Sequence, residues 1–417
     1  MLDLKAVRRD PDAVRAALAR RRDGSDARLD EALALDARRR ELLPGVEGLR
    51  ARQNEASQAI ARAKKEGGDA AEAIAEMQEV SGRVKALSEE LAAVEADLER
   101  ALVTIPNPPD PTAADADATV REVGERREGS RDHLELAGGL IDMEAAARVS
   151  GSRFAYLKGD IVLLELALVR WGMELLMGRG FEPVVPPVLV REEALYGTGF
   201  LPDTEQQIYR LADDPLYLVG TSEVPLASLH AGEILDGAAL PLRYAGSSPC
   251  FRREAGAAGR DTRGIFRVHQ FGKLEMFSFV EPGAAVDEHE RLLSIEEEIL
   301  QALDLPYRVV NIGADDLGVS AAKKYDCEAW IPSQDRYREV TSTSNTTDFQ
   351  ARRLDIRYRP AAGGGPRHVA TLNGTAVTWR HMIALLENGQ QADGSVVLPS
   401  VLREWGAPEV LRVGERA

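Results

Sequence analysis

The sequence predicts an α+β protein in three parts: a long antiparallel helical hairpin at 1–103, a linker at 104–118 and an antiparallel-sheet domain at 119–417. A repeat of apolar residues at helical spacing predicts the hairpin, a proline-rich break predicts the linker, and short β-rich runs between helices predict the sheet. The 417 residues are 44% hydrophobic and 29% charged, which is ordinary globular composition and excludes wholesale disorder.

The hairpin is preceded by a short helix predicted over residues 1 to about 22. The first long helix is predicted from about Ala27 to Lys65, with a kink at Pro44, because proline lacks an N–H and clashes with the preceding turn. A turn at Gly67–Gly68–Asp69 leads into the second helix. Its apolar residues recur at steps of three and four, close to the repeat of a coiled-coil seam, at Ile74, Met77, Val80, Val84, Leu87, Leu91, Val94 and Leu98.

Each long helix would extend on the order of 55 Å, which is too long to be buried in a domain of this size. The hairpin is therefore expected to project into solvent. Periodicity alone leaves two interpretations open: a dimerisation or spacer arm, or a lever that reaches a large partner. Basic residues gather toward the tip, but acids are interleaved with them, so charge alone is weak evidence. These residues are Arg50, Arg52, Arg62, Lys64, Lys65, Arg83 and Lys85.

The linker, TIPNPPDPTAADADA, contains four prolines and few apolar residues, which makes it the clearest boundary in the chain. Beyond it, helices are mixed with adjacent strands joined by short loops, a pattern typical of a largely antiparallel sheet. Strands are predicted at 182–190, 216–221, 266–280, 337–343 and 368–372. Helices are predicted at 161–178, 287–303 and 376–388.

Charge and cysteine content exclude several classes of protein. With 52 Lys and Arg against 68 Asp and Glu, the net charge is −16, which argues against coating nucleic acid through global charge but allows a local basic surface. The cysteines, Cys250 and Cys327, stand alone, so neither a disulfide framework nor a structural zinc site is expected. The most apolar stretch, 161–177, is interrupted by charges, and the first residues lack an apolar signal core. The sequence therefore predicts a cytoplasmic protein without a membrane partner.

The β-rich region is unusually rich in paired arginine and glutamate residues. Several familiar site motifs are missing from the sequence. There is no GxxxxGKS/T phosphate loop, no GxGxxG after a strand, no HExxH and no GxSxG. If two strands flank the loop AGAAGRDTRG, alternation places Arg252 with Glu254 on one face, and Arg267 with His269 and Phe271 on the partner strand. Arginines clamp phosphates, a carboxylate accepts from an amine and a ring stacks on a base, which favours a nucleotide site. A surface ribbon with cross-strand ion pairs remains the alternative.

These same residues carry a family resemblance. FRRE, the glycine-rich loop and RVHQF resemble motif 2 of class II aminoacyl-tRNA synthetases, GFEPVVPP (180–187) resembles motif 1, and 374–380 resembles motif 3. Within that class the chain is similar to bacterial seryl-tRNA synthetases along essentially its whole length. The stretches that carry this similarity include YLVGTSEVPL, KKYDCEAWIP, EVTSTSNTTDFQARR and LLENGQQADGS. The resemblance implies a class II catalytic domain, with a sheet of six or seven strands, behind an N-terminal tRNA-binding arm.

The resemblance also implies an ATP site. Arg252 would contact the α-phosphate and the serine carboxylate, and Arg267 would contact the γ-phosphate. Glu254 would accept from the adenine amino group, with Phe271 and Arg380 on the two faces of the ring. The other residues implied for ATP are Arg253, Val268, Glu339, Val340, Thr341 and Ser342.

A magnesium ion and a serine complete the implied site. Glu339 and Ser342 would bind Mg²⁺, since oxygen ligands suit this hard cation, and no zinc is expected. Glu223 would pair with the serine ammonium, whereas Glu275 and Thr375 would recognise the hydroxyl. The remaining residues implied for serine are Thr221, Ser222, Arg252 and Asn373, and those implied to act in catalysis are Arg252, Glu275 and Arg380.

The implied reaction forms seryl-adenylate from L-serine and ATP, and then transfers serine to the 3′ end of tRNA(Ser). The implied assembly is a homodimer through motif 1, with tRNA contacts on the arm at Arg50, Arg62, Lys64, Lys65 and Arg83. The sequence does not decide whether tRNA(Sec) is also charged. Two alternatives also remain: a paralogue that transfers activated serine to a non-tRNA acceptor, and a duplicate synthetase that confers resistance to an inhibitor. A non-catalytic scaffold is a further alternative, but it has no need for Arg252, Glu254, Glu275, Glu339 and Arg380 together.

Overall fold

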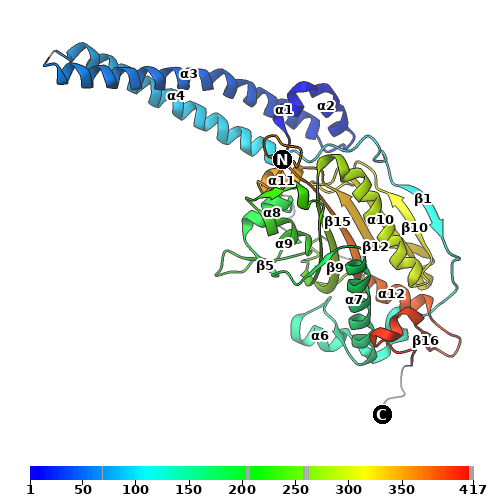
Figure 1. Ribbon diagram of the computed structural model, residues 1–417. Helices are drawn as coiled ribbons and strands as arrows, with labels where there is room; N and C mark the ends of the chain where they lie inside the picture. Colours follow the sequence, from blue (N-terminus) through cyan, green and yellow to red (C-terminus); the bar gives the residue numbers. More distant parts are fainter. Residues whose placement is uncertain (68, 203–206, 257–258, 260, 262, 413–417) are drawn as a thin grey trace. The chain divides into compact units, whose positions relative to one another are not determined.

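The computed structural model describes residues 1–67, 69–202, 207–256, 259, 261 and 263–412 (Figure 1). The chain divides into two compact units, Met1–Pro106 and Asn107–Ala417. Within the described residues, no helix combines the length and the apolar character that a membrane crossing requires. Cys250 and Cys327 are both buried free thiols.

The first unit is entirely helical. It contains α1 (Leu4–Arg9), α2 (Pro11–Ala19), α3 (Ser25–Lys65) and α4 (Ala71–Val103). The single helix expected over residues 1–22 is wrong, because the chain divides it at Asp10. The Asp10 side chain accepts from the Ala13 N–H, and Pro11 occupies the first position of α2, where the missing N–H costs nothing.

The predicted hairpin is confirmed, with α3 and α4 side by side (Figure 1). Leu42, Val46 and Leu91 are buried in the seam between the two helices. Nearer the first helices, a second apolar cluster contains Leu29 and Leu98. Helix α3 is continuous through Pro44, so the proline does not end the helix. Gly68 of the expected turn lies outside the described residues.

The second unit is built on an eight-stranded sheet in the order β1-β10-β11-β12-β15-β9-β8-β4. All neighbours pair antiparallel except β4 and β8, which confirms the predicted α+β fold with more strands than the six or seven expected. The strands are β1 (Ala118–Val123), β4 (Glu182–Val184), β8 (Leu242–Phe251), β9 (Gln270–Val280), β10 (Tyr307–Asn311), β11 (Lys323–Ile331), β12 (Arg336–Asn345) and β15 (Ala370–Thr378).

Helices and smaller sheets surround this sheet. The helices are α5 (His133–Ala137), α6 (Met143–Ser150), α7 (Asp160–Gly178), α8 (Glu192–Thr198), α9 (Glu223–Ala227), α10 (Ala285–Ala302), α11 (Phe349–Arg353) and α12 (Trp379–Asn388). The smaller strands are β2 (Ile141–Asp142), β3 (Tyr156–Leu157), β5 (Leu189–Val190), β6 (Tyr217–Leu218), β7 (Ile234–Asp236), β13 (Arg357–Arg359), β14 (Arg367–His368), β16 (Val396–Val397) and β17 (Val410–Leu411).

Two predicted elements have different bounds. The strand expected over 182–190 is two strands, β4 and β5, because the intervening segment contains Pro186 and Pro187, which cannot donate to a ladder. The helix expected over 376–388 begins at Trp379, since residues 376–378 complete β15. Thr378 then caps the helix in a reciprocal pair with His381.

The two faces of the sheet are covered differently, as alternation along β9 shows. Leu274 and Met276 point into the main core, which includes residues of α7, α10 and α12. Phe277 and Phe279 belong to a second apolar cluster on the opposite face, with residues of α9 and α11. Lys273 and Glu275 have the same parity as these phenylalanines. The second face is therefore apolar at one end of β9 and charged at the other.

Pro44 offers a test of the hairpin. A proline inside a helix removes one hydrogen bond and costs about 3 kcal/mol, so Pro44→Ala is expected to slow amide hydrogen exchange across residues 38–50. The matched control is Pro11→Ala, because Pro11 stands at the first position of α2, where proline is favourable. We expect no gain in protection there. Equal protection of wild type and Pro44→Ala would show that α3 carries no such penalty.

Candidate active site

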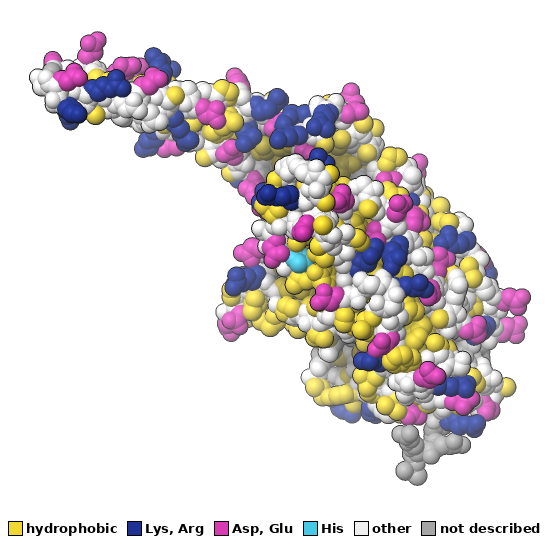
Figure 2. All heavy atoms as spheres, viewed as in Figure 1, with side chains coloured by type: hydrophobic (Ala, Val, Ile, Leu, Met, Phe, Trp, Pro, Cys, Tyr) yellow, Lys and Arg dark blue, Asp and Glu magenta, His cyan; other side chains and the backbone are white. Residues whose placement is uncertain are grey.

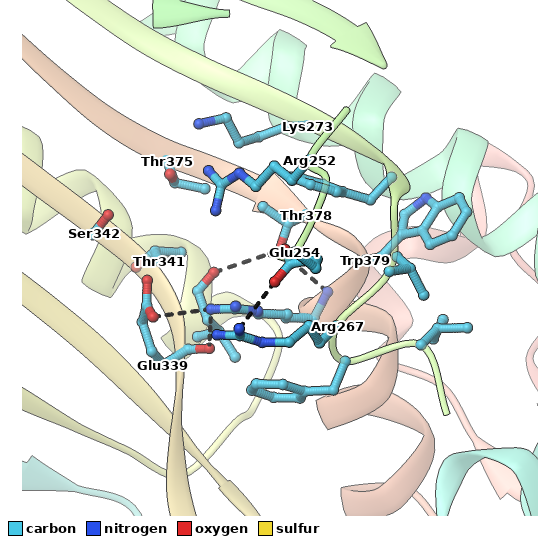
Figure 3. Close-up of a pocket in the computed structure, with 16 residues that line it drawn as sticks. Arg252, Glu254, Arg267, Lys273, Glu339, Thr341, Ser342, Thr375, Thr378 and Trp379 are labelled. Carbon is cyan, nitrogen blue, oxygen red and sulfur yellow. Dashed lines mark hydrogen bonds and ion pairs between the residues drawn. The ribbon is translucent and has the colours of Figure 1, made fainter. Parts of the chain in front are cut away.

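Two adjoining pockets, the two parts of one site, open on the charged face of the sheet, at the ends of β8, β9, β12 and β15 and the start of α12, and Figure 3 shows the first of them. The first part contains Phe266, Val268, Phe271, Glu339, Val340 and Thr341, and the second contains Thr221, Glu223, Glu275 and Asn373. Residues that line both parts join them: Arg252, Glu254, Arg267, Lys273, Ser342, Thr375 and Arg380.

Strand bulges explain how these side chains reach one face. In β12 the register with β11 shifts at Val340, so Glu339 and Ser342, three residues apart, both line the pocket. In β15 the register with β9 shifts at Ala376, and Thr375 and Thr378 line it in the same way. A regular strand would send residues three apart to opposite faces.

The residues of the predicted nucleotide ribbon converge, but not by strand alternation. Strand β8 ends at Phe251 and β9 begins at Gln270, so the strand expected from 266 starts later. Glu254 adopts a left-handed φ of 50°, which turns the chain. Its carboxylate pairs with the Arg267 guanidinium at 2.9 Å (Figure 3). Part of the intervening glycine-rich loop, residues 257–258, 260 and 262, lies outside the described residues.

Two phenylalanine rings in the pocket carry arginines on their faces. The Arg252 guanidinium carbon lies 5.3 Å from the centre of the Phe271 ring. Arg380 and Arg338 lie 4.6 Å and 3.7 Å from the centre of the Phe266 ring. Phe266 is not among the site residues predicted from the sequence. The FRVHQF segment contains both phenylalanines, so the two aromatic residues in one short segment could have indicated it.

Glu339, on β12, forms an ion pair in the pocket with Arg380. Arg380 Nη1 lies 3.0 Å from the Glu339 carboxylate and donates to its backbone carbonyl at 3.0 Å. Burial favours the neutral acid, but Arg380 and then Lys324 outweigh it and lower the pKa of Glu339 to about 2. Glu339 is therefore anionic across the physiological pH range.

The other part of the pocket combines buried acids with one lysine. Lys273, only 8% exposed, donates to the Thr221 hydroxyl at 2.6 Å and pairs with the Glu275 carboxylate. The amide of Gln350 donates to Glu223 at 2.8 Å. Burial and the nearby carboxyl of Glu275 raise the pKa of Glu223 to about 7. Burial also raises the pKa of Glu275, although Lys273 opposes the change.

Lys273 was missed by the sequence analysis. It lies two residues from Phe271 and two from Glu275, so period-two alternation within FGKLE already placed it on their face. Asn373 and Thr375 of β15 line the same part of the pocket, and Figure 3 shows the Arg252 guanidinium and the Lys273 ammonium extending toward the side of Thr375.

Three predicted positions do not line the pocket. Ser222 is fully buried, and its hydroxyl hydrogen-bonds that of Ser248 at 2.8 Å. Arg253 is exposed and is absent from both parts of the pocket. His269 instead packs its ring near Phe154 and Tyr209. Residues next to each other alternate in direction, so one neighbour of a site residue commonly points away.

The described residues contain no cluster of three or more His, Cys, Asp or Glu side chains arranged to bind a metal. What they do offer is an ionised Glu339 beside the hydroxyl-bearing Ser342. Magnesium is commonly bound by one or two carboxylates together with substrate phosphates, so a preformed cluster is not required. The donor set fits such a cation.

The predicted tRNA residues of the first unit are all exposed: Arg50, Arg62, Lys64, Lys65 and Arg83. Nearer α1 and α2, arginines of the hairpin pair with acids across it, as Arg39 does with Glu95 at 2.9 Å. None of the five predicted residues forms an ion pair within the described part of the chain. On the face that Figure 2 shows, basic and acidic side chains are interspersed along the hairpin.

The chemistry that this geometry allows is specific. Guanidinium groups beside aromatic rings suit a planar base with a phosphate chain, and an ionised carboxylate can accept a phosphate-bound cation. The second part, which contains Glu223, Glu275 and Lys273, suits a small molecule that carries both an ammonium and a hydroxyl. The two parts meet at Arg252, which can contact groups in both.

Two family models match the chain. Residues 1–109 match the seryl-tRNA synthetase N-terminal domain, and residues 208–389 match the tRNA synthetase class II core domain for G, H, P, S and T. The chain is 50% identical over 420 residues to a serine–tRNA ligase from Thermobifida fusca, with 99% of each chain covered. It is 51% identical over 421 residues to a serine–tRNA ligase from Nocardia farcinica, again with 99% of each covered.

Solved structures agree with these matches. A seryl-tRNA synthetase from Pyrococcus horikoshii, complexed with ATP, superposes with a TM-score of 0.92 at 40% identity, over 98% of this chain and 99% of that one. A cytoplasmic serine–tRNA ligase from Naegleria fowleri, in complex with AMP, gives a TM-score of 0.86 at 29% identity, over 97% and 96%.

Proposed function

The chain belongs to the seryl-tRNA synthetase family and is a serine–tRNA ligase, and we propose how its residues divide the work of that reaction. A carboxylate oxygen of serine attacks the α-phosphorus of ATP, and the bond to the β-phosphate breaks to release pyrophosphate. The 3′-terminal ribose of the tRNA then attacks the seryl carbonyl, and AMP leaves. The observation that carries the proposal is that Arg252 lines both parts of the pocket.

For the nucleotide, we assign the phosphates to Arg252 and Arg267 and the adenine to Glu254, Phe271 and Arg380. Arg252 is suited to charge that builds up on the α-phosphate, since it already lies in both parts of the pocket. Val268, Val340 and Thr341 also line the nucleotide part. Arg253 is the weakest member of the expected set because it is exposed.

Glu339 and Ser342 would bind Mg²⁺, which would neutralise charge on the phosphates. The support is the low pKa of Glu339, which keeps the carboxylate ionised, and the bulge that brings the Ser342 hydroxyl to the same face. Arg380 pairs with that carboxylate at 3.0 Å, and this pairing holds the guanidinium beside the residues assigned to the adenine.

For serine, we assign the ammonium to Glu223 and the hydroxyl to Glu275 and Thr375, with Thr221 and Asn373 lining the same part. A pocket that hydrogen-bonds the hydroxyl rejects alanine, because alanine would leave buried polar groups unsatisfied. Ser222 supports the turn before α9 from the interior rather than touching the amino acid.

The acceptor is tRNA(Ser), with the exposed cations of the hairpin as its contacts, and the enzyme acts in the cytoplasm as a homodimer. Exposed apolar side chains support the dimer: Val185 lies in the motif 1 segment, and Leu163, Leu166 and Met177 lie on α7, the helix before it. Exposed apolar side chains of this size are typical of a subunit interface when they form a patch.

The proposal is tested by ATP–pyrophosphate exchange with each of the twenty amino acids, with and without tRNA. We expect exchange with serine alone, and aminoacylation of tRNA(Ser) in a second assay. Exchange driven by a different amino acid would contradict the roles of Glu275 and Thr375. Folded protein that supports no exchange at all would contradict the activation step itself.

The pH dependence of serine use follows from Glu223. Its pKa of about 7 means that the carboxylate, the form that pairs with the serine ammonium, grows as the pH rises through that value. We expect kcat/KM for serine in exchange to rise roughly tenfold per unit below pH 7 and to level off above it. Glu223→Gln should lower kcat/KM and remove this limb. A profile that is the same in wild type and variant would assign the titration to another group.

The hairpin contacts are tested by reversing charge at Arg62, Lys64 and Lys65. With all three changed to Glu, we expect the KM for tRNA to rise about tenfold or more and its salt dependence to weaken, since phosphate contacts are lost. Serine-dependent exchange without tRNA should not change. The matched control reverses Glu66, Glu72 and Glu76 to Lys, which are exposed on the same hairpin and should not weaken tRNA binding. Unaltered tRNA charging in the first variant would exclude the proposed contact.

A further inference from the structure

A buried glutamate lies behind the pocket, on the face of the sheet opposite the substrates. Glu296 of α10 is 0% exposed and does not line either part of the pocket. One carboxyl oxygen, Oε1, accepts from the Thr375 backbone N–H at 3.0 Å. The other, Oε2, lies 2.8 Å from the Thr341 hydroxyl and shares a hydrogen bond with it. The carboxyl group thus touches both β15 and β12.

These contacts occur where the two strands separate. The ladder between β12 and β15 contains Asn345–Leu372, Ser344–Asn373 and Thr343–Gly374, and it ends there. Regular pairing would next join Ser342 to Thr375, but that pair is missing and both strands continue apart. The Thr375 N–H, left without a strand partner, is satisfied by Glu296 instead.

Gly374 leaves room for this carboxyl group. A Cβ at Gly374 would lie 3.0 Å from the Met276 methyl group, 3.1 Å from Glu296 Oε1 and 3.3 Å from the Thr343 hydroxyl, which is closer than most real contacts. A glycine at this position therefore accommodates both Met276 and the carboxyl group of Glu296 against β15.

The surroundings favour a proton on Glu296. No ion pair to it is found among the described residues, whereas the next residue, Glu297, pairs with Arg121. Burial, together with the carboxyl groups of Asp326 and Glu275, raises the pKa of Glu296 well above its usual value. A protonated Oε2 donates to the Thr341 hydroxyl while Oε1 still accepts from Thr375.

We propose that Glu296 is a positioning residue whose protonated carboxyl group bridges the unpaired ends of β12 and β15. Through this bridge it sets the position of Thr375, assigned to the serine hydroxyl, relative to Thr341 and Ser342, assigned to ATP and Mg²⁺. The inference rests on the proposed function, because it concerns the spacing of those two substrates.

Two substitutions at Glu296 separate the protonated bridge from simple packing. Glu296→Gln retains an acceptor for Thr375 and a donor for Thr341, so it should keep the KM for serine within about threefold of wild type. Glu296→Leu fills similar space but makes neither bond, so the KM for serine should rise about tenfold or more. The controls are Glu297→Gln and Glu297→Leu, which should lower the melting temperature through loss of the Arg121 pair and leave the KM for serine unchanged.

A second readout does not depend on activity. Hydrogen exchange of the peptide that contains the Thr375 amide should accelerate in Glu296→Leu and stay protected in Glu296→Gln. If wild type supports no serine-dependent exchange, the proposed function fails while this readout still tests the bridge. If wild type is active and Glu296→Leu matches it in both readouts, the bridge alone is excluded.

Two further outcomes decide the remaining cases. Glu296→Gln as impaired as Glu296→Leu would overturn the protonated form. Should Glu296→Leu fail to fold, Thr341→Val removes the bridge from its other end, and we expect the KM for serine to rise although Thr341 belongs to the nucleotide strand. A rise confined to the KM for ATP would contradict the proposal.

Discussion

Antiparallel pairing of β8, β9, β15 and β12 is the constraint on which the rest of the catalytic unit depends. Pairing fixes which side chains share a face, and at the pocket end of β9 the two faces have opposite character. There Leu274 and Met276 meet the long helices, while Lys273 and Glu275 meet the pocket. A shift of one residue in β9 would turn Lys273 and Glu275 into the main apolar core and Leu274 and Met276 toward the pocket, so the apolar core fixes the register of the site.

The site departs from ideal pairing at two places, and both lie among residues that line the pocket. The bulges at Val340 and Ala376 turn residues three apart to one face. Near them β12 and β15 separate, and the Thr375 N–H has no hydrogen-bond partner on β12. A buried carboxyl group from α10 occupies this gap. The same departure thus creates both the pocket and the need for a support behind it.

The pKa of each acid in the pocket depends on its own burial and its own charged neighbours. Glu339 is kept ionised by Arg380 and Lys324, whereas Glu223 and Glu275 lie deeper and have raised pKa values. Acids in one pocket therefore differ in pKa because their burial and their cationic neighbours differ. The five cations predicted to contact tRNA are exposed and form no ion pair within the described residues. At such exposed positions salt screens electrostatic interactions strongly.

The sequence by itself determined the helical hairpin and the family, because periodicity and motif spacing are properties of short stretches. It also placed Arg252, Glu254, Arg267 and Glu275 in one pocket. Only the tertiary structure decided that Ser222 and Arg253 point elsewhere, that Lys273 and Phe266 belong to the pocket, and that Glu296 supports it from behind. The reason is physical: bulges, register and contacts across the sheet depend on residues distant in the chain, which local patterns do not encode.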